Sequence, residues 1–166
     1  MEKLIIFLPL AASIISGFFG KIIGNKASQI TTTLFVSLSA LLSIYIFYDV
    51  INNDYTNNVL IAKWISSGLL DVNWSIKIDQ LSAVMLVVVT LVSAIVHIYS
   101  IGYMSHDPHQ PRFMSYLSLF TFAMLVLVTS DNFLQLFFGW EGVGLCSYFL
   151  IGFWFKRSRA NAAAIK

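Results

Sequence analysis

Residues 74–104 have the sequence WSIKIDQLSAVMLVVVTLVSAIVHIYSIGYM, and this stretch decides the fold. After Asp79 the chain carries no Asp, Glu, Lys or Arg until Asp107. A helix of about 20 apolar residues crosses the hydrocarbon core of a bilayer, which is ~30 Å thick. The stretch therefore predicts a membrane-spanning helix at about 80–104.

The rest of the chain has the same character, since 58% of its 166 residues are hydrophobic and only 11% are charged. This composition is typical of a membrane protein. The ~10-residue alternating strands of a membrane barrel are absent, whereas lengths near 20 residues suit helices. We therefore expect an all-α membrane protein with a single membrane domain over 1–166. Its other four spans are predicted at about 4–23, 27–48, 113–130 and 132–155.

The charges of the connections predict an orientation, because Lys and Arg in short loops favour the cytoplasmic side. One side of the membrane receives six basic residues, namely Lys21, Lys26, Arg112, Lys156, Arg157 and Arg159. The other side receives Lys3, Lys63 and Lys77 together with Glu2, Asp49, Asp54, Asp71, Asp79 and Asp131. We expect the first side to be the cytoplasm or matrix, which places the N terminus outside.

The one long connection lies between the second and third spans and ends in an alternating pattern. Apolar Val72, Trp74, Ile76 and Ile78 are separated by single polar residues, and a period of two indicates a strand. A second apolar run precedes a Ser-Ser-Gly turn at 66–68. These features predict an external β-hairpin at about 59–79, with an irregular amphipathic flap as the alternative.

Glu141 is the one carboxylic acid inside the fifth apolar run. At 1.5 Å per residue it lies near the bilayer centre, where an ionised carboxylate costs at least ~2.5 kcal/mol. The acid is therefore either protonated or faced by water or a cation inside the bundle. One interpretation is a protonated structural pin, and the other, which we favour, is a proton-relay site.

Small residues lie beside this acid. Gly139, Gly142 and Cys146 follow the spacing i, i+3 and i+7, which lines one helix face and lets another helix approach closely. From this stripe we expect Glu141 to face protein. Cys146 is the only cysteine, so a disulfide framework is excluded.

The remaining titratable residues give weaker signals. His97 lies within the third span, where a neutral, hydrogen-bonded imidazole is one interpretation and a proton relay the other. His106 and His109 share a short loop, but too few other metal-ligating side chains lie near them in the sequence to complete the coordination of a metal ion. No metal site is therefore expected. Asp79 and Asp131 open helices, and N-terminal capping is their expected role, with proton collection as the alternative.

The blocks LFFGWEGVGLCSYFLIGFWF (136–155), residues 74–104 and the terminal NAAAIK resemble a known family. They are similar to the antiporter-like membrane subunits of respiratory complex I, the family of bacterial subunit L and mitochondrial subunit 5, which is shared with multisubunit sodium/proton antiporters. The resemblance is strong from about Trp74 to Lys166 and loose over the first two spans. It implies that the chain is the N-terminal portion of a longer antiporter-like subunit.

The resemblance also implies a function. The expected protein is a proton-translocating membrane subunit of NADH:quinone oxidoreductase in a bacterial or mitochondrial inner membrane. Glu141 would act with a lysine on a later helix, for which Lys166 should not be mistaken. The chain would carry no cofactor or redox site of its own, because NADH, FMN, iron–sulfur clusters and quinone bind to partner subunits. Its partners would be the lipid bilayer and other complex I membrane subunits, with no nucleic acid and no substrate except protons.

Two alternatives remain open on the sequence alone. The first is the related subunit of a multisubunit Na⁺/H⁺ antiporter, which shares the fold and Glu141. The second is a truncated product with only a structural role, since the family continues into further helices after the position of Lys166.

Overall fold

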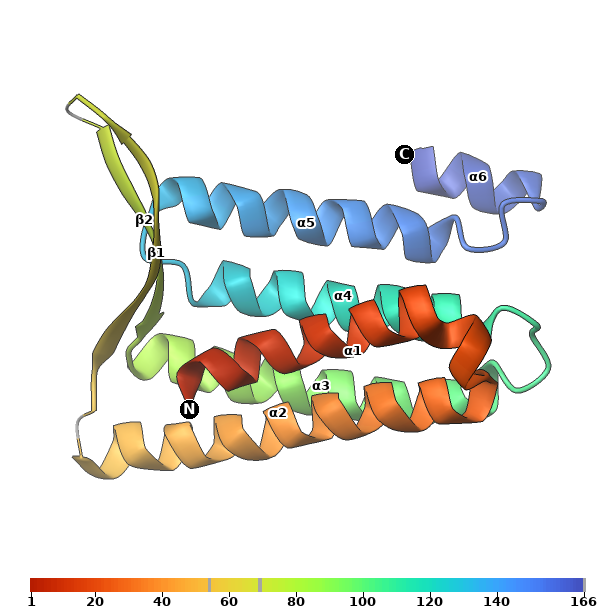
Figure 1. Cartoon of the computed structure of the whole chain (residues 1–166), viewed down its shortest axis with the longest axis horizontal. Coiled ribbons are helices and arrows are strands. Elements are labelled where there is room, and N and C mark those ends of the chain that lie inside the picture. The colour runs from red at the N-terminus through yellow and green to blue at the C-terminus, as the bar shows by residue number, and fades with distance from the viewer. Residues whose placement is uncertain (54, 69, 166) are drawn as a thin grey trace.

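The computed structural model describes residues 1–53, 55–68 and 70–165. Asp54, used in the orientation argument, and Lys166 lie outside the described residues. Five long helices run side by side, and a hairpin crosses one end of the bundle (Figure 1). In chain order the elements are α1 (Glu2–Ile23), α2 (Asn25–Asn53), β1 (Asn57–Ser67), β2 (Leu70–Ile78), α3 (Gln80–Tyr103), α4 (Gln110–Val128), α5 (Phe133–Ile151) and α6 (Ser158–Ile165).

The five long helices confirm the predicted spans. Each has 19 to 29 residues and is apolar enough to cross a membrane. At 1.5 Å per residue, 19 residues extend roughly 28 Å, close to the thickness of the hydrocarbon core. The chain is therefore a multi-pass membrane protein with an all-helical bundle.

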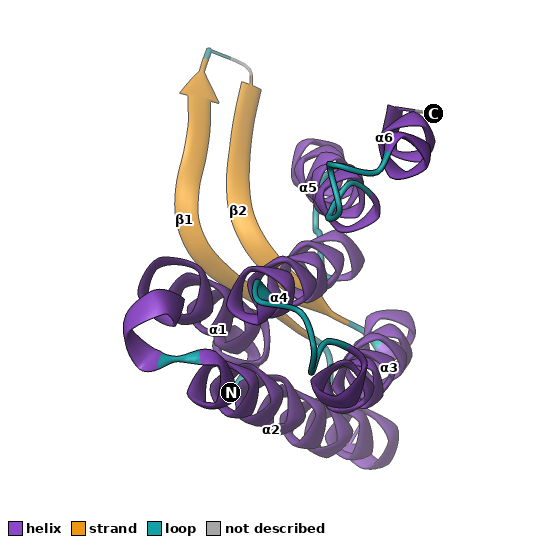
Figure 2. Ribbon diagram, turned by 90° about the vertical axis from the view of Figure 1, so that its right-hand side faces the viewer, coloured by secondary structure: helices purple, strands orange, loops and turns teal. Residues whose placement is uncertain are grey.

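The bundle has a layered arrangement in which α5 occupies one edge. Helix α1 packs against α2 and α4, α2 packs against α3, and α4 packs against α5. Figure 2, which looks along the helices, shows α4 between α3 and α5, with α6 beyond α5. This order leaves one side of α5 without a covering helix among the described elements.

Several helix ends differ from the predicted ones. Helix α2 continues to Asn53 rather than 48, because the amides of Asn52 and Asn53 hydrogen-bond one turn back to the Tyr48 carbonyl and the Asp49 carboxylate. The fifth span ends at Ile151 rather than 155, where Gly152 forms the C-cap. The short helix α6 was not predicted.

The hairpin is confirmed. Strands β1 and β2 pair antiparallel from Asn57 opposite Ile78 to Ser67 opposite Leu70, and Gly68 adopts a φ of +58° at the turn. Only residues without a strong Cβ penalty enter this left-handed region readily, which explains a glycine there.

The base of the hairpin is fixed to the connection between α4 and α5. The Lys77 N–H donates to the Thr129 carbonyl at 2.9 Å. The Gln135 side chain satisfies both backbone groups of Ser75, accepting from its N–H at 3.1 Å and donating to its carbonyl at 2.8 Å. The Asn132 amide donates to the Asn73 carbonyl at 2.8 Å. These bonds hold β2 across the start of α5.

A hydrophobic core fills the same end of the bundle. Its members come from β2, α1, α2, α3 and α4, so the hairpin closes the core that the helices form. The buried residues are Ile5, Ile6, Ile46, Val50, Ile76, Ile78, Ala83, Leu86, Leu125 and Val126.

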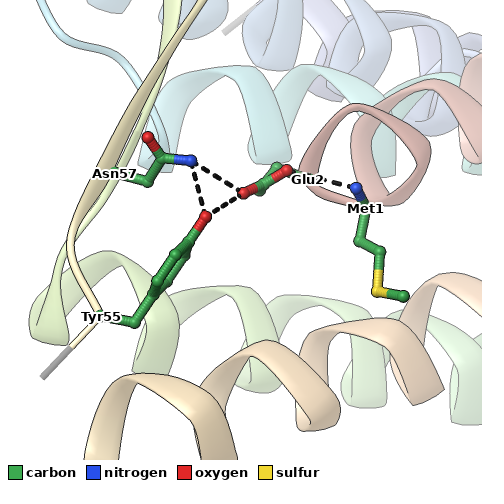
Figure 3. Close-up of polar contacts among 4 residues, drawn as sticks. All are labelled: Met1, Glu2, Tyr55 and Asn57. Carbon is green, nitrogen blue, oxygen red and sulfur yellow. Dashed lines mark hydrogen bonds and ion pairs between the residues drawn. The ribbon is translucent and has the colours of Figure 1, made fainter. Parts of the chain in front are cut away.

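A polar cluster ties the N terminus of α1 to the hairpin (Figure 3). The Tyr55 hydroxyl donates to Glu2 Oε1 at 2.6 Å, and the Asn57 amide donates to the same oxygen at 3.1 Å. The Met1 amino group lies 3.2 Å from Glu2 Oε2. The hydrogen bond to Glu2, with burial as a smaller cause, raises the pKa of the Tyr55 phenol above its ordinary value of 10.0. The neutral phenol therefore persists as the donor at neutral pH.

Candidate functional site

Glu141 lies near the middle of α5, and its side chain is exposed. None of the described residues covers it, so the expectation that it faces protein stays a prediction. The reason for its exposure is helical geometry: with 3.6 residues per turn, Glu141 is rotated by about 200° from Gly139, so the two project from opposite faces. The small residues contact α4, and the acid points away from it.

The close helix approach predicted from the small-residue stripe is confirmed. A Cβ on Gly139 would lie 2.8 Å from the Leu127 Cα on α4, and one on Gly142 would lie 3.2 Å from the Ala123 Cβ. Cys146 is buried on the same side. Glycine at 139 thus permits backbone contact between α4 and α5.

The face that carries Glu141 is otherwise apolar. Within a turn or two of the acid, Phe137, Trp140, Leu145 and Tyr148 are each at least half exposed. In the most apolar stretch of α5, only 17% of the residues are buried, whereas 33% to 39% are buried in the corresponding stretches of the other four spans. A lone carboxylate on such a face is stable in a bilayer only when it is protonated or when a polar group or water covers it.

His97 is completely buried between α3 and α4. Its Nδ1 lies 2.8 Å from the Ser93 carbonyl, and its Nε2 lies 3.0 Å from the Ser118 hydroxyl. Because a carbonyl only accepts, Nδ1 donates to it. The Ser118 hydroxyl can donate to a neutral imidazole or accept from a protonated one, so the same two contacts join α3 to α4 in either charge state.

The structure does not bring the two sequence-predicted site residues together. His97 of α3 contacts Ser118 of α4, whereas Glu141 is exposed on α5, on the helix face opposite the one that contacts α4. Helices α3 and α5 lie on different sides of α4 (Figure 2). Any transfer of a proton between them would need further groups. Next to His97, the half-buried Ser93 hydroxyl and the buried Thr121 hydroxyl form a hydrogen bond that extends the polar contact between α3 and α4.

The two carboxylates predicted to cap helices differ. Asp79 caps α3 as expected: its Oδ1 accepts from the Ser82 N–H at 2.8 Å, and the Asp79 N–H donates to the Ser82 hydroxyl at 2.7 Å. Asp131 does not cap α5, because Asn132 takes that position and accepts from the Gln135 N–H. Asp131 instead accepts hydrogen bonds from Asn58 and Ser75 of the hairpin.

The His106 and His109 side chains do not form part of a cluster of metal-ligating groups among the described residues. Both are exposed, and Asp107 accepts from the His109 N–H and from Trp154 Nε1. Within residues 1–53, 55–68 and 70–165, no group of three His, Cys, Asp or Glu side chains is placed to hold a metal ion.

Sequence reasoning missed Gln135, which is buried and anchors the hairpin. A polar amide one turn inside an apolar span was the available signal. Arg112 was counted only as a loop charge, although its guanidinium lies over two phenylalanine rings. The aromatic run from Phe153 to Phe155 was the signal for that contact.

Comparison with known proteins places these features among respiratory-chain subunits. Residues 64–114 match a family model described as NADH-Ubiquinone oxidoreductase (complex I), chain 5 N-terminus. Residues 130–166, which include Glu141, match one described as NADH:quinone oxidoreductase/Mrp antiporter, TM.

Individual relatives are similar along the whole chain. NADH-ubiquinone oxidoreductase chain 5 of Arabidopsis thaliana is 57% identical over 166 residues, which is 100% of this chain and 25% of the relative. NADH-quinone oxidoreductase subunit L of Rickettsia conorii is 58% identical over 163 residues, which is 98% of this chain and 25% of the relative. The chain spans about a quarter of the length of the curated relatives it matches.

Proposed function

Since the chain belongs to the family of complex I chain 5 and subunit L proteins, we propose that it serves in a proton-translocating membrane subunit of an NADH:quinone oxidoreductase. The subunit resides in a bacterial or mitochondrial inner membrane and packs against other membrane subunits of the complex. The redox chemistry belongs to partner subunits, which bind NADH, FMN, iron–sulfur clusters and quinone. The contribution of this chain is a path for protons.

The observation that carries the proposal is the position of Glu141. Glu2 opens α1 and Asp49 is among the last five residues of α2, whereas Glu141 is the one carboxylic acid near the middle of a span among the described residues. It lies on a face of α5 that no described helix covers. Intramembrane acids are costly, and they commonly mark ion or proton pathways. An acid that is poised between its two protonation states by its surroundings can accept and release a proton.

The proposed partner of Glu141 is a lysine on a helix outside these 166 residues. In an interior of low dielectric constant, a nearby ammonium favours the ionised carboxylate, and separation of the pair favours the protonated acid. A change in the distance between the two groups would therefore drive proton uptake at one and release at the other.

His97 is a second candidate for proton relay. Its Nε2 lies 3.0 Å from the Ser118 hydroxyl, so a proton bound at Nε2 would make the imidazole donate to that hydroxyl, which would then accept. A relay role therefore reverses the direction of a hydrogen bond between α3 and α4, whereas a structural role leaves the imidazole neutral throughout. We rank it below Glu141 because both ring nitrogens already have partners.

The proposal is tested with the assembled complex in inverted membrane vesicles. Glu141→Gln keeps the size of the side chain and removes its charge, and we expect NADH-driven proton uptake to fall because the relay step slows by about a hundredfold. Leu145→Gln is the matched control, since it places the same amide one turn away on the same exposed face. Native gels report assembly of both variants.

Normal proton uptake by an assembled Glu141→Gln complex would refute the relay. Replacement of His97 by Gln should have a smaller effect, and an equal loss would reverse the ranking of the two residues.

A second candidate function is a subunit of a multisubunit Na⁺/H⁺ antiporter. It is favoured by the match over residues 130–166, whose family description names both protein classes. The two functions predict different companions. Co-purification of the chain with NADH-oxidising activity supports the oxidoreductase, whereas sodium-dependent proton exchange without that activity supports the antiporter.

A further inference from the structure

At the end of the bundle opposite the hairpin, the α3–α4 connection, the start of α4 and the α5–α6 connection come together (Figure 1). The segment from 153 to 157 has the sequence FWFKR and lies beside Arg112. Asp107 is the one carboxylate at this end among the described residues. The local charge is therefore strongly positive.

Arg112 is held in an unusual setting. Its guanidinium carbon lies 4.6 Å from the centre of the Phe153 ring, and a terminal nitrogen donates to the Phe153 carbonyl at 3.3 Å. Its Nε is buried and has no hydrogen-bond partner among the described residues, and no described carboxylate forms an ion pair with it. A partly dehydrated cation with an unused donor is suited to bind an anion.

Two cavities meet at this arginine. The first, which we call the basic pocket, has a volume of 190 Å³ and is lined by His109, Arg112 and residues 153–157. The second, the aromatic pocket, has a volume of 420 Å³, and its wall includes Arg112, Tyr116, Tyr148, Phe149 and Ile165. Arg112, Phe153 and Phe155 line both, so a pocket that carries three cationic side chains, Arg112, Lys156 and Arg157, adjoins one lined mainly by aromatic and aliphatic residues.

The wall of the basic pocket is fixed by Asp107. Its Oδ2 accepts from Trp154 Nε1 at 2.9 Å, and its Oδ1 accepts from the His109 N–H at 2.7 Å. Trp154 in turn supports Arg157, whose guanidinium carbon lies 5.1 Å from the centre of its indole. The carboxylate is thus engaged in positioning the pocket, and the two arginines remain available to a ligand.

We propose that the basic pocket binds the phosphate of an anionic phospholipid headgroup, with an acyl chain of the lipid in the aromatic pocket. The planar guanidinium fork matches phosphate oxygens, and basic pockets between membrane helices bind acidic headgroups. The pockets lie at the ends of apolar helices α4 and α5, the depth at which headgroups and aromatic side chains gather. An acidic protein segment could bind in the basic pocket, but it has no acyl chain to occupy the aromatic pocket.

The proposal is independent of proton transport and is tested on the purified full chain by native mass spectrometry. Phosphatidylglycerol and phosphatidylcholine with identical acyl chains are supplied in equal amounts, and retained lipid is counted. We expect the wild type to retain phosphatidylglycerol in preference. Arg112→Gln and the exposed Arg157→Gln should each lower that preference about fivefold. Lys21→Gln is the matched control, because Lys21 is exposed and lines neither pocket.

Three results would overturn the proposal. Equal retention of the two lipids by the wild type would show that no acidic headgroup is selected. An unchanged preference in Arg157→Gln, whose exposed position leaves folding intact, would move the site elsewhere. Displacement of phosphatidylglycerol by inorganic phosphate that is itself retained would show that the pocket takes a free anion rather than a lipid.

Discussion

Within the bundle, hydroxyl and amide side chains meet in pairs across the boundaries between helices. Ser43 on α2 lies 2.7 Å from Thr90 on α3, and the Gln29 amide on α2 donates to Gln110 on α4 at 3.0 Å. In a bilayer such bonds contribute only about 0.6 kcal/mol each on average, because the same polar groups also find partners in the unfolded, membrane-inserted chain. Each pair fixes the height at which two helices meet, which apolar contacts alone do not specify.

Asp79 gives a prediction at the level of one residue. The hydrogen bond from the Ser82 N–H, as the largest cause, lowers the pKa of Asp79 below its ordinary value of 3.8. Loss of the cap in Asp79→Ala should lower the free energy of unfolding by about 1 kcal/mol, whereas Asp79→Asn keeps an acceptor and should lose less. Chemical unfolding in detergent measures both differences.

The same residue predicts a pH dependence. A lowered pKa in the folded state means that the ionised form contributes stability, which is complete above pH 3.8 and is lost as the pH falls through the lowered pKa. The stability difference between wild type and Asp79→Asn should therefore shrink below pH 3.8. If the stability difference between wild type and Asp79→Asn stayed constant with pH, the negative charge of Asp79 would not contribute to the cap.

Asp79 and Asp131 show what a single sequence reveals about individual residues. Asp79 is followed three positions later by Ser82, and this spacing predicts a capping box that the structure contains. Asp131 is followed at that spacing by Leu134, whereas Asn132 is followed by Gln135 and is the residue that caps α5. The actual partners of Asp131, Asn58 and Ser75, lie on a hairpin whose docking position cannot be deduced from periodicity. Contacts between distant segments decided the outcome.

At the level of elements, the contact between α4 and α5 depends on Gly139. Gly139→Ala would place a methyl group 2.8 Å from the Leu127 Cα, and backbone cannot move aside as a side chain can. We expect a loss of about 1–3 kcal/mol in the free energy of unfolding. Thermal unfolding in detergent measures it.

The matched control lies on the same helix. A Cβ on Gly144 meets nothing within 4 Å, so Gly144→Ala should be neutral or slightly stabilising through higher helix propensity. Equal effects of the two substitutions would show that α4 and α5 are not packed through Gly139.

The elements were largely predictable, and the exceptions have physical causes. Long apolar runs and a period-two pattern specify spans and strands because burial imposes those repeats. Helix α6 has only eight residues and contains neither a long apolar run nor a period-two pattern, so neither signal is present. The exposed face of α5 also escaped prediction, because the stripe at Gly139 and Gly142 indicates where a helix packs without indicating what occupies its other side.

At the level of the whole molecule, charge is divided between the two ends of the bundle. The hairpin end carries the acids Glu2, Asp71, Asp79 and Asp131 beside three lysines, Lys3, Lys63 and Lys77, whereas the opposite end carries one acid, Asp107, and the arginines beside Trp154, among the described residues. This division supports the proposed orientation, in which the hairpin and the N terminus lie outside and the basic end faces the cytoplasm or matrix.

Labelling of single cysteines tests this orientation. Ser67→Cys lies at the exposed hairpin tip, and Ser158→Cys lies exposed at the opposite end. A membrane-impermeant maleimide applied to intact cells or mitoplasts should label the first and not the second, and inverted vesicles should give the reverse. The wild type, whose only cysteine is the buried Cys146, is the unlabelled control. Labelling of Ser158→Cys from outside would invert the topology.

The bonds between Ser75 and Gln135 also set an order of events during synthesis. The two residues are 60 positions apart, so at about 5–20 residues per second the ribosome needs roughly 3–12 s to deliver the second after the first. For that interval the backbone N–H and carbonyl of Ser75 lack the partner that Gln135 provides in the folded chain. Synthesis of α5 supplies that partner, so the translation of one helix determines when a different part of the protein can be fixed in place.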